Sequence, residues 1–170
     1  MYPYLTYNDY ISLYPDELSN VQFDRFAWEA SSILDWHTTT VDGVSKLRDA
    51  FPTDEFDRMA VIRCLARLVN VLYEIEKITN EIAAERALIQ EPDGTTHSTK
   101  ISSRSSGAES VSYAEMAKRN LVSQVPLIEK IASDVAYRGE YIGNIIKMSL
   151  ANVKDANGVN LLYIGVYPRV

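Results

Sequence analysis

The side chains that could take part in acid–base, nucleophilic or metal chemistry are few and widely spaced. His37 and His97 are the only histidines, and Cys64 is the only cysteine. One cysteine excludes an intramolecular disulfide and any multi-cysteine zinc or iron–sulfur site. Neither histidine has the spacing to a carboxylate pair that metal sites in helical bundles use. We therefore expect no metal ion and no cofactor.

Cys64 and the helical acidic residues have simpler structural interpretations. Cys64 lies in an apolar run with helical spacing, where cysteine is typically a small core residue. Glu74 and Glu81 share a helix face, but a di-iron site also needs Glu-x-x-His motifs on other helices, and the sequence has none. The chain also lacks a phosphate-binding glycine loop and a nucleophile elbow. The sequence therefore predicts a protein that is not an enzyme and has no catalytic residues.

Composition and charge exclude further classes. A chain of 170 residues with 46% apolar and 24% charged residues is typical of one globular domain, here residues 1–170. The first 60 residues hold 4 of the 17 basic and 11 of the 23 acidic residues, so their net charge is −7 and that of the remainder is +1. A pI near 4.9 argues against a dedicated nucleic-acid-binding protein. The sequence predicts no membrane span and no secretion signal.

The elements that would position any site are mostly helices. Ser19 and Gln22 form the sequence signature of a capping box at the start of a helix. Thr53 is the expected N-cap of one long helix, because no glycine or proline interrupts the helical spacing of its apolar residues until Pro92. The predicted helical segments in the first half of the chain are residues 7–14, 20–36, 44–51 and 53–90.

The second half of the chain begins with a change in composition. Ten of the eighteen residues from 95 to 112 are serine or threonine, and this segment, taken as 95–113, is either a linker loop or a loose β-hairpin. Helices are expected over residues 114–124 and from Pro126 to Gly139. Residues 140–153 are compatible with a helix or a strand, and a turn follows.

The last twelve residues, 159–170, are too apolar for a free tail, so they need a surface in this subunit or in another. The predicted fold is a mostly α, small helical bundle with one long helix, a Ser/Thr-rich loop or β-hairpin and an extended C-terminal tail. Its helical core falls within about residues 6–90 and 113–152.

Two segments are distinctive in combination with this order of helices. The first is the serine-rich element, Ile101-Ser102-Ser103 through Glu109-Ser110-Val111-Ser112-Tyr113, and the second is the tail, Leu161-Leu162-Tyr163-Ile164-Gly165-Val166. With the acidic, tyrosine-containing N-terminus and the long helix, they resemble the head–tail connector, or adaptor, proteins of long-tailed bacteriophages. The resemblance covers most of the chain.

The resemblance implies a structural virion protein. Twelve copies would form a homo-oligomeric ring below the portal, join the phage head to the tail and continue the channel through which double-stranded DNA leaves the virion. Its partners would be the portal protein and a stopper or tail-completion protein. It would be made in the host cytoplasm and located in the neck of the virion.

The resemblance also suggests roles for the two segments. The tail residues 161–166 would dock on the portal or on a neighbouring subunit, where an apolar, strand-prone segment suits β-augmentation. Residues 101–103 and 109–113 would make inter-subunit or downstream contacts. Acidic residues would suit a channel in which DNA slides without sequence-specific binding, because carboxylates repel phosphates. The candidates for that lumen are Asp9, Asp16, Glu17 and Asp24.

Other functions are compatible with the same sequence. A stopper or tail-completion protein of the same neck is the nearest alternative, although such proteins are more often rich in β-structure. A cellular helical protein-interaction module would have the same composition. An enzyme built on a helical bundle is disfavoured because the sequence offers no site for it.

Overall fold

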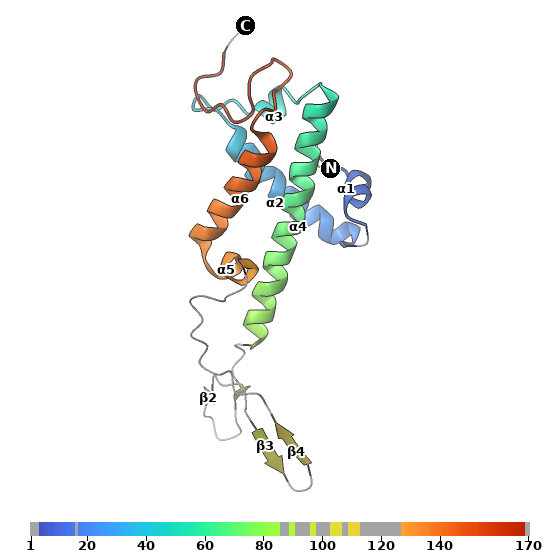
Figure 1. Cartoon of the computed structure of the whole chain (residues 1–170), viewed down its shortest axis with the longest axis vertical. Coiled ribbons are helices and arrows are strands. Elements are labelled where there is room, and N and C mark those ends of the chain that lie inside the picture. The colour runs from blue at the N-terminus through green and yellow to red at the C-terminus, as the bar shows by residue number, and fades with distance from the viewer. Residues whose placement is uncertain are drawn as a thin grey trace. The chain divides into compact units, whose positions relative to one another are not determined.

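The computed structural model describes residues 4–15, 17–85, 89–90, 96–97, 103–106, 109–112 and 127–168. This part of the chain is mostly helical, and one of its helices is much longer than the others, as the sequence predicts. The chain divides into two compact units, one of residues 1–74 and 135–170 and one of residues 75–134. Figure 1 shows the elements of the first unit and their labels.

Two N-terminal helices each begin directly after a capping residue. Helix α1, Tyr7–Leu13, starts after Thr6, whose hydroxyl accepts a hydrogen bond from the Asp9 amide. Helix α2, Asn20–Thr38, starts at the predicted capping box, in which the Ser19 hydroxyl and the Gln22 side chain each accept a backbone N–H of the other residue. Each of these helix starts is set by hydrogen bonds between residues three positions apart, so the sequence around the cap is enough to predict it.

The long helix begins slightly later than predicted. A short helix, α3, covers Lys46–Asp49, and α4 covers Glu55–Glu85, a length of 31 residues. The carboxylate of Asp54, and not the predicted Thr53 hydroxyl, accepts the amides of Phe56 and Asp57 at 2.9 and 3.1 Å. An acidic cap also complements the positive end of the helix dipole.

Two helices follow near the C-terminal end of the chain, and the second covers most of residues 140–153, for which the sequence allowed a helix or a strand. Helix α5, Leu127–Ser133, belongs to the second unit, and α6, Val135–Leu150, runs in the first unit without interruption at its two glycines. The buried side chains of α6 recur with the helical period, so burial of one face stabilises the helix despite Gly139 and Gly143. The buried residues of that face are Ile142, Gly143, Ile145, Ile146 and Leu150.

The core of the first unit joins α1, α2, α4 and α6 (Figure 1). Tyr10 of α1 is fully buried, and its ring lies 5.2 Å from that of Phe23 of α2. Tyr4, before α1, stacks on Phe51 at 5.5 Å. The N-terminal tyrosines therefore belong largely to the core, with Tyr7 and Tyr14 packed against it. The largest fully buried residues of the other helices include Leu34, Leu65, Leu68, Ile146 and Leu150.

The second unit contains the described strands. β1, Ile89–Gln90, pairs antiparallel with β2, Thr96–His97, so residues 89–90, predicted as the end of the long helix, form a strand instead. β3, Ser103–Ser106, pairs antiparallel with β4, Glu109–Ser112, in a register that sets Ser103 opposite Ser112. The Ser/Thr-rich segment thus contains the hairpin that the sequence allowed. The helix predicted over residues 114–124 lies outside the described residues. None of the described helices has the length and apolar character needed to cross a membrane.

Candidate functional site

The C-terminal tail folds back onto its own unit. The Leu161 amide donates a hydrogen bond of 2.9 Å to the Val153 carbonyl, and Lys154 forms an antiparallel bridge with Asn160. The Leu161 side chain is fully buried in the core. Leu161 is therefore not available for docking in this conformation, which corrects its predicted role, and Leu162 is half-buried against the same core.

A buried lysine holds the next part of the tail. Lys46 of α3 is fully buried, and its Nζ donates hydrogen bonds to the main-chain carbonyls of Asn160, at 3.2 Å, and Tyr163. Burial lowers the pKa of Lys46, and the nearby Asp155 carboxylate opposes this shift. These carbonyls satisfy an ammonium group that would otherwise be costly to bury.

A second anchor fixes the far end of the tail. The Tyr167 hydroxyl donates a 2.5 Å hydrogen bond to Asp155, and the Tyr167 amide donates to Asp42 at 3.2 Å. Asp155 also accepts the amides of Asn157 and Val159, at 2.9 and 2.8 Å, which closes the turn predicted at that position. Burial, followed by the hydrogen bond to Asp155, raises the pKa of Tyr167.

Between the two anchors, the tail presents apolar side chains to solvent. Tyr163, Ile164 and Val166 are 46%, 64% and 65% exposed, and we call these three residues the tail ridge. The Val41 amide donates to the Ile164 carbonyl at 3.1 Å, so the backbone of the ridge is tied to the turn after α2. At Gly165, an added Cβ would lie 2.2 Å from the Tyr163 hydroxyl oxygen, so any larger residue would force the ring to move.

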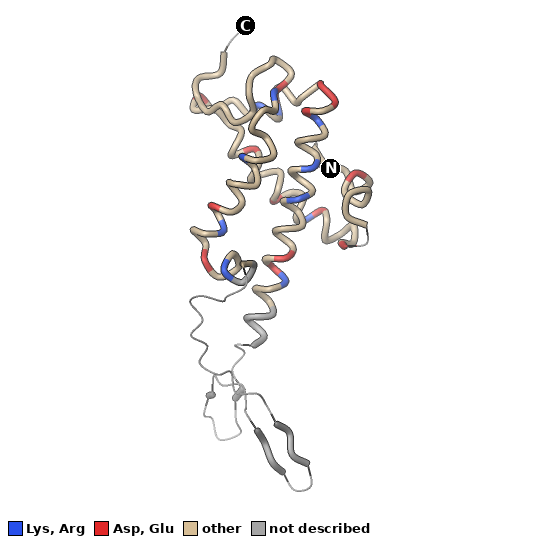
Figure 2. The backbone as a smooth tube through the Cα atoms, viewed as in Figure 1, with Lys and Arg blue, Asp and Glu red and all other residues tan. Residues whose placement is uncertain are grey.

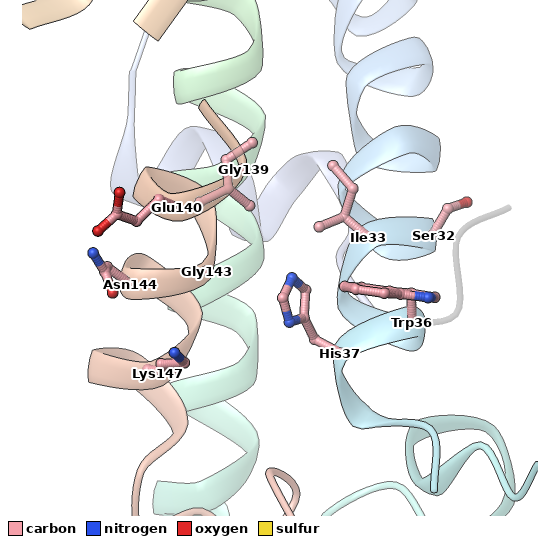
Figure 3. Close-up of a pocket in the computed structure, with 10 residues that line it drawn as sticks. Ser32, Ile33, Trp36, His37, Gly139, Glu140, Gly143, Asn144 and Lys147 are labelled. Carbon is pink, nitrogen blue, oxygen red and sulfur yellow. The ribbon is translucent and has the colours of Figure 1, made fainter. Parts of the chain in front are cut away.

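A groove of about 650 Å³ opens between α2 and α6 (Figure 3). The His37 ring points from α2 toward α6, where a Cβ at Gly143 would lie 3.8 Å from its Cε1. The Trp36 and His37 rings meet edge to face at 4.8 Å. Burial, and then the positive charge of Lys147, lower the pKa of His37. The groove is lined by Ser32, Ile33, Trp36 and His37 of α2 and Gly139, Glu140, Ile142, Gly143, Asn144 and Lys147 of α6.

The predicted lumen residues have different surroundings. Asp9 accepts the Thr6 hydroxyl at 2.7 Å within the cap of α1. Glu17 accepts the Asn70 side-chain amide at 2.7 Å. Asp24 is exposed on α2, and Asp16 lies outside the described residues. Figure 2 shows charged residues of both signs along α4 and α6.

The predicted loop residues divide between described and undescribed positions. Ser103 lies in β3, and Glu109, Ser110, Val111 and Ser112 form β4. Ile101, Ser102 and Tyr113 lie outside the described residues. The register places Ser110 opposite Ser105 and Val111 opposite Arg104. The hairpin therefore includes five of the eight residues predicted for inter-subunit or downstream contacts.

Residues suited to chemistry remain apart in the described structure. No group of three or more His, Cys, Asp or Glu side chains in the described ranges could hold a metal ion. Cys64 is buried, and burial raises the pKa of its thiol to about 11, so little thiolate forms near neutral pH. Comparison with family models, with curated proteins and with solved structures finds no match.

Sequence reasoning missed both tail anchors and the groove. The turn at 155–158 was visible in the sequence, but no sequence signal placed the Lys46 ammonium in the interior. Trp36 is the last residue of the helix predicted over residues 20–36, and the structure places it 75% exposed on the groove wall. The groove also requires α2 and α6, which are about a hundred residues apart, to lie side by side.

Proposed function

We propose that this chain is a head–tail connector subunit, an adaptor that docks on a phage portal and extends the DNA channel toward the tail. The observation that carries the proposal is the tail ridge: apolar side chains exposed to solvent on a backbone that Lys46 and Asp155 hold in place. Ordering a segment before it binds reduces the entropy lost on binding. An apolar surface of this kind indicates a protein partner.

The order of the elements and the serine-rich and tail segments supply the identity of that partner, through their resemblance to the connector family. A ring of twelve subunits follows from the same resemblance. The mostly helical fold favours the adaptor over a stopper or tail-completion protein, because those neck proteins are more often rich in β-structure. The hairpin β3–β4 would then make the contacts to neighbouring subunits or to the next neck protein.

The proposal is tested by co-sedimentation of the purified chain with portal rings produced from the same genome. Ile164→Asp places a charge on the tail ridge at an exposed position, so the fold should be retained. We expect portal binding to weaken at least about tenfold, as for a residue at the centre of an interface. Val21→Asp is the matched control, because Val21 is 81% exposed on α2 and lies outside the ridge.

Portal binding by the unmodified chain and by the two variants distinguishes docking through the tail ridge from docking elsewhere and from no docking. Weak binding by Ile164→Asp and normal binding by Val21→Asp would support docking through the ridge. Equal binding by all three proteins would place the portal contact elsewhere on the chain. Failure of the unmodified chain to bind well-formed portals would contradict the adaptor function and favour a later neck component or a cellular interaction module.

A further inference from the structure

One rim of the groove carries two opposite charges. Glu140 and Lys147 are exposed on the same side of α6, and neither forms an ion pair with any described residue. They lie two helical turns, or about 10.5 Å, apart along the axis, too far to pair with each other. Asn144 lies between them (Figure 3). This rim therefore presents a negative, a neutral polar and a positive side chain in order.

When α6 of a second copy runs antiparallel to this one, the negative end of each rim lies beside the positive end of the other. If the two-fold axis passes between Gly143 and Asn144, Glu140 of each copy faces Lys147 of the other, so both ion pairs form together. We propose that a second copy of this chain packs antiparallel along this rim of α6, about a two-fold axis.

The residues around the charges agree with a close approach of two helices. A glycine inside a helix costs about 1 kcal/mol relative to alanine, yet α6 has two. A Cβ at Gly139 would meet no atom within 4 Å, and one at Gly143 would make only an ordinary contact with His37, so packing within the subunit requires neither glycine. Gly139 is exposed, so a second backbone passing near it could use the space that a side chain would fill.

The opposite wall of the groove supplies apolar area. Trp36 of α2 is 75% exposed across the groove from the α6 rim, and tryptophan is among the residues that contribute most to protein interfaces. The two ion pairs would fix the direction and register of the helices, since the parallel arrangement in the same register brings like charges together. Burial of Trp36 from each copy would provide most of the attraction.

This pairing goes beyond the proposed connector function and does not depend on it. A two-fold contact uses the same surface on both copies, so it closes on itself and cannot extend into a ring. The dimer is therefore a state of the free chain, separate from its assembly on a portal. The tail ridge is not part of the α6 rim, so the two proposals are tested by different variants.

The experiment is sedimentation velocity over a concentration series with charge-reversed variants. Glu140→Lys and Lys147→Glu each turn both ion pairs into like-charge contacts. We expect each variant alone to have a dimer dissociation constant raised by about thirtyfold. A mixture of the two variants should form a heterodimer, because two positive side chains on the rim of one chain then face two negative side chains on the rim of the other. Circular dichroism checks that these exposed substitutions leave the helices intact.

The outcomes are distinct. Dimerisation of the unmodified chain, its loss in each variant and its return in the mixture would establish the antiparallel α6 contact. A monomeric unmodified chain at the highest concentration would overturn the proposal. Equal dimerisation by both variants and the unmodified chain would also overturn it, because the dimer would then use another surface. Portal binding, measured separately, tests the connector function independently of these results.

Discussion

The ammonium group of Lys46 donates a 3.2 Å hydrogen bond to the main-chain carbonyl of Asn160, which lies 114 residues further along the chain. The same group donates to the carbonyl of Tyr163, so one buried side chain fixes the start of the tail ridge. The exposed apolar residues of the tail are therefore positioned by the interior of the unit.

Lys46→Met should loosen the tail and leave the helices folded. Methionine fills a similar volume, but the part-buried carbonyls of Asn160 and Tyr163 lose a charged hydrogen-bond donor, at a cost of about 1–3 kcal/mol. We expect the amides of residues 161–167 to exchange with deuterium about tenfold faster or more, because the tail opens locally more often. Lys154→Met, at an exposed lysine of the same segment, is the matched control. Unchanged exchange in Lys46→Met would show that the lysine does not anchor the tail.

Leu161→Ala should destabilise the whole first unit. The Leu161 side chain is 0% exposed in the core, and truncation of a buried leucine costs about 2–5 kcal/mol. Ile164→Ala, on the exposed tail ridge, should change the unfolding free energy by less than about 0.5 kcal/mol. Urea unfolding of both variants measures the difference. Similar small effects would place Leu161 outside the core and restore its predicted docking role.

The contrast between these two residues shows what the sequence could predict about the tail. The apolar composition of residues 159–170 correctly predicted that the tail needs a surface, but alternation along the chain did not reveal which side chains face it. Leu161 turns inward because its amide pairs with Val153, a contact set by the turn at residues 155–158. Local patterns predicted caps and turns well, as at Ser19, because these depend on neighbouring residues.

Features that join distant segments were beyond sequence reasoning. The sequence left residues 140–153 open between helix and strand, whereas burial of Ile142 and Ile146 keeps α6 helical across Gly139 and Gly143. The intrinsic helical propensity of a residue is a weak guide to secondary structure where tertiary packing stabilises one conformation. The groove likewise depends on α2 and α6 meeting, and the position of Lys46 depends on the folded tail, so neither could be found from spacing along the chain.

Stability should fall in alkaline solution through Tyr4. The Tyr4 hydroxyl donates to Asp35 at 3.0 Å, and burial followed by this carboxylate raises the pKa of Tyr4. Above about pH 10 the unfolded chain releases this proton while the folded chain retains it, so stability decreases by about 1.4 kcal/mol per pH unit from this group. In Tyr4→Phe this part of the decrease should disappear.

Urea unfolding between pH 9 and pH 11 would measure that effect, with Tyr163→Phe as the control because Tyr163 is partly exposed on the tail ridge. An alkaline slope that is the same in Tyr4→Phe and in the unmodified chain would contradict the hydrogen bond between Tyr4 and Asp35 as a source of pH dependence.

Cys64 should resist thiol reagents in the folded protein. The Cys64 residue is 1% exposed, and burial raises the pKa of its thiol to about 11. Since the thiolate is the reactive form, we expect labelling by a chromogenic disulfide at pH 8 to be at least about a hundredfold slower than in denaturant. Equal rates would mean that the core around Cys64 opens readily.

The most direct test of the connector function is electron microscopy of the unmodified chain after incubation with portal rings from the same genome. The account predicts class averages with an added, rotationally symmetric layer at one end of the portal, and loss of that layer with Ile164→Asp. Bare portal rings at saturating concentrations of the unmodified chain would contradict it.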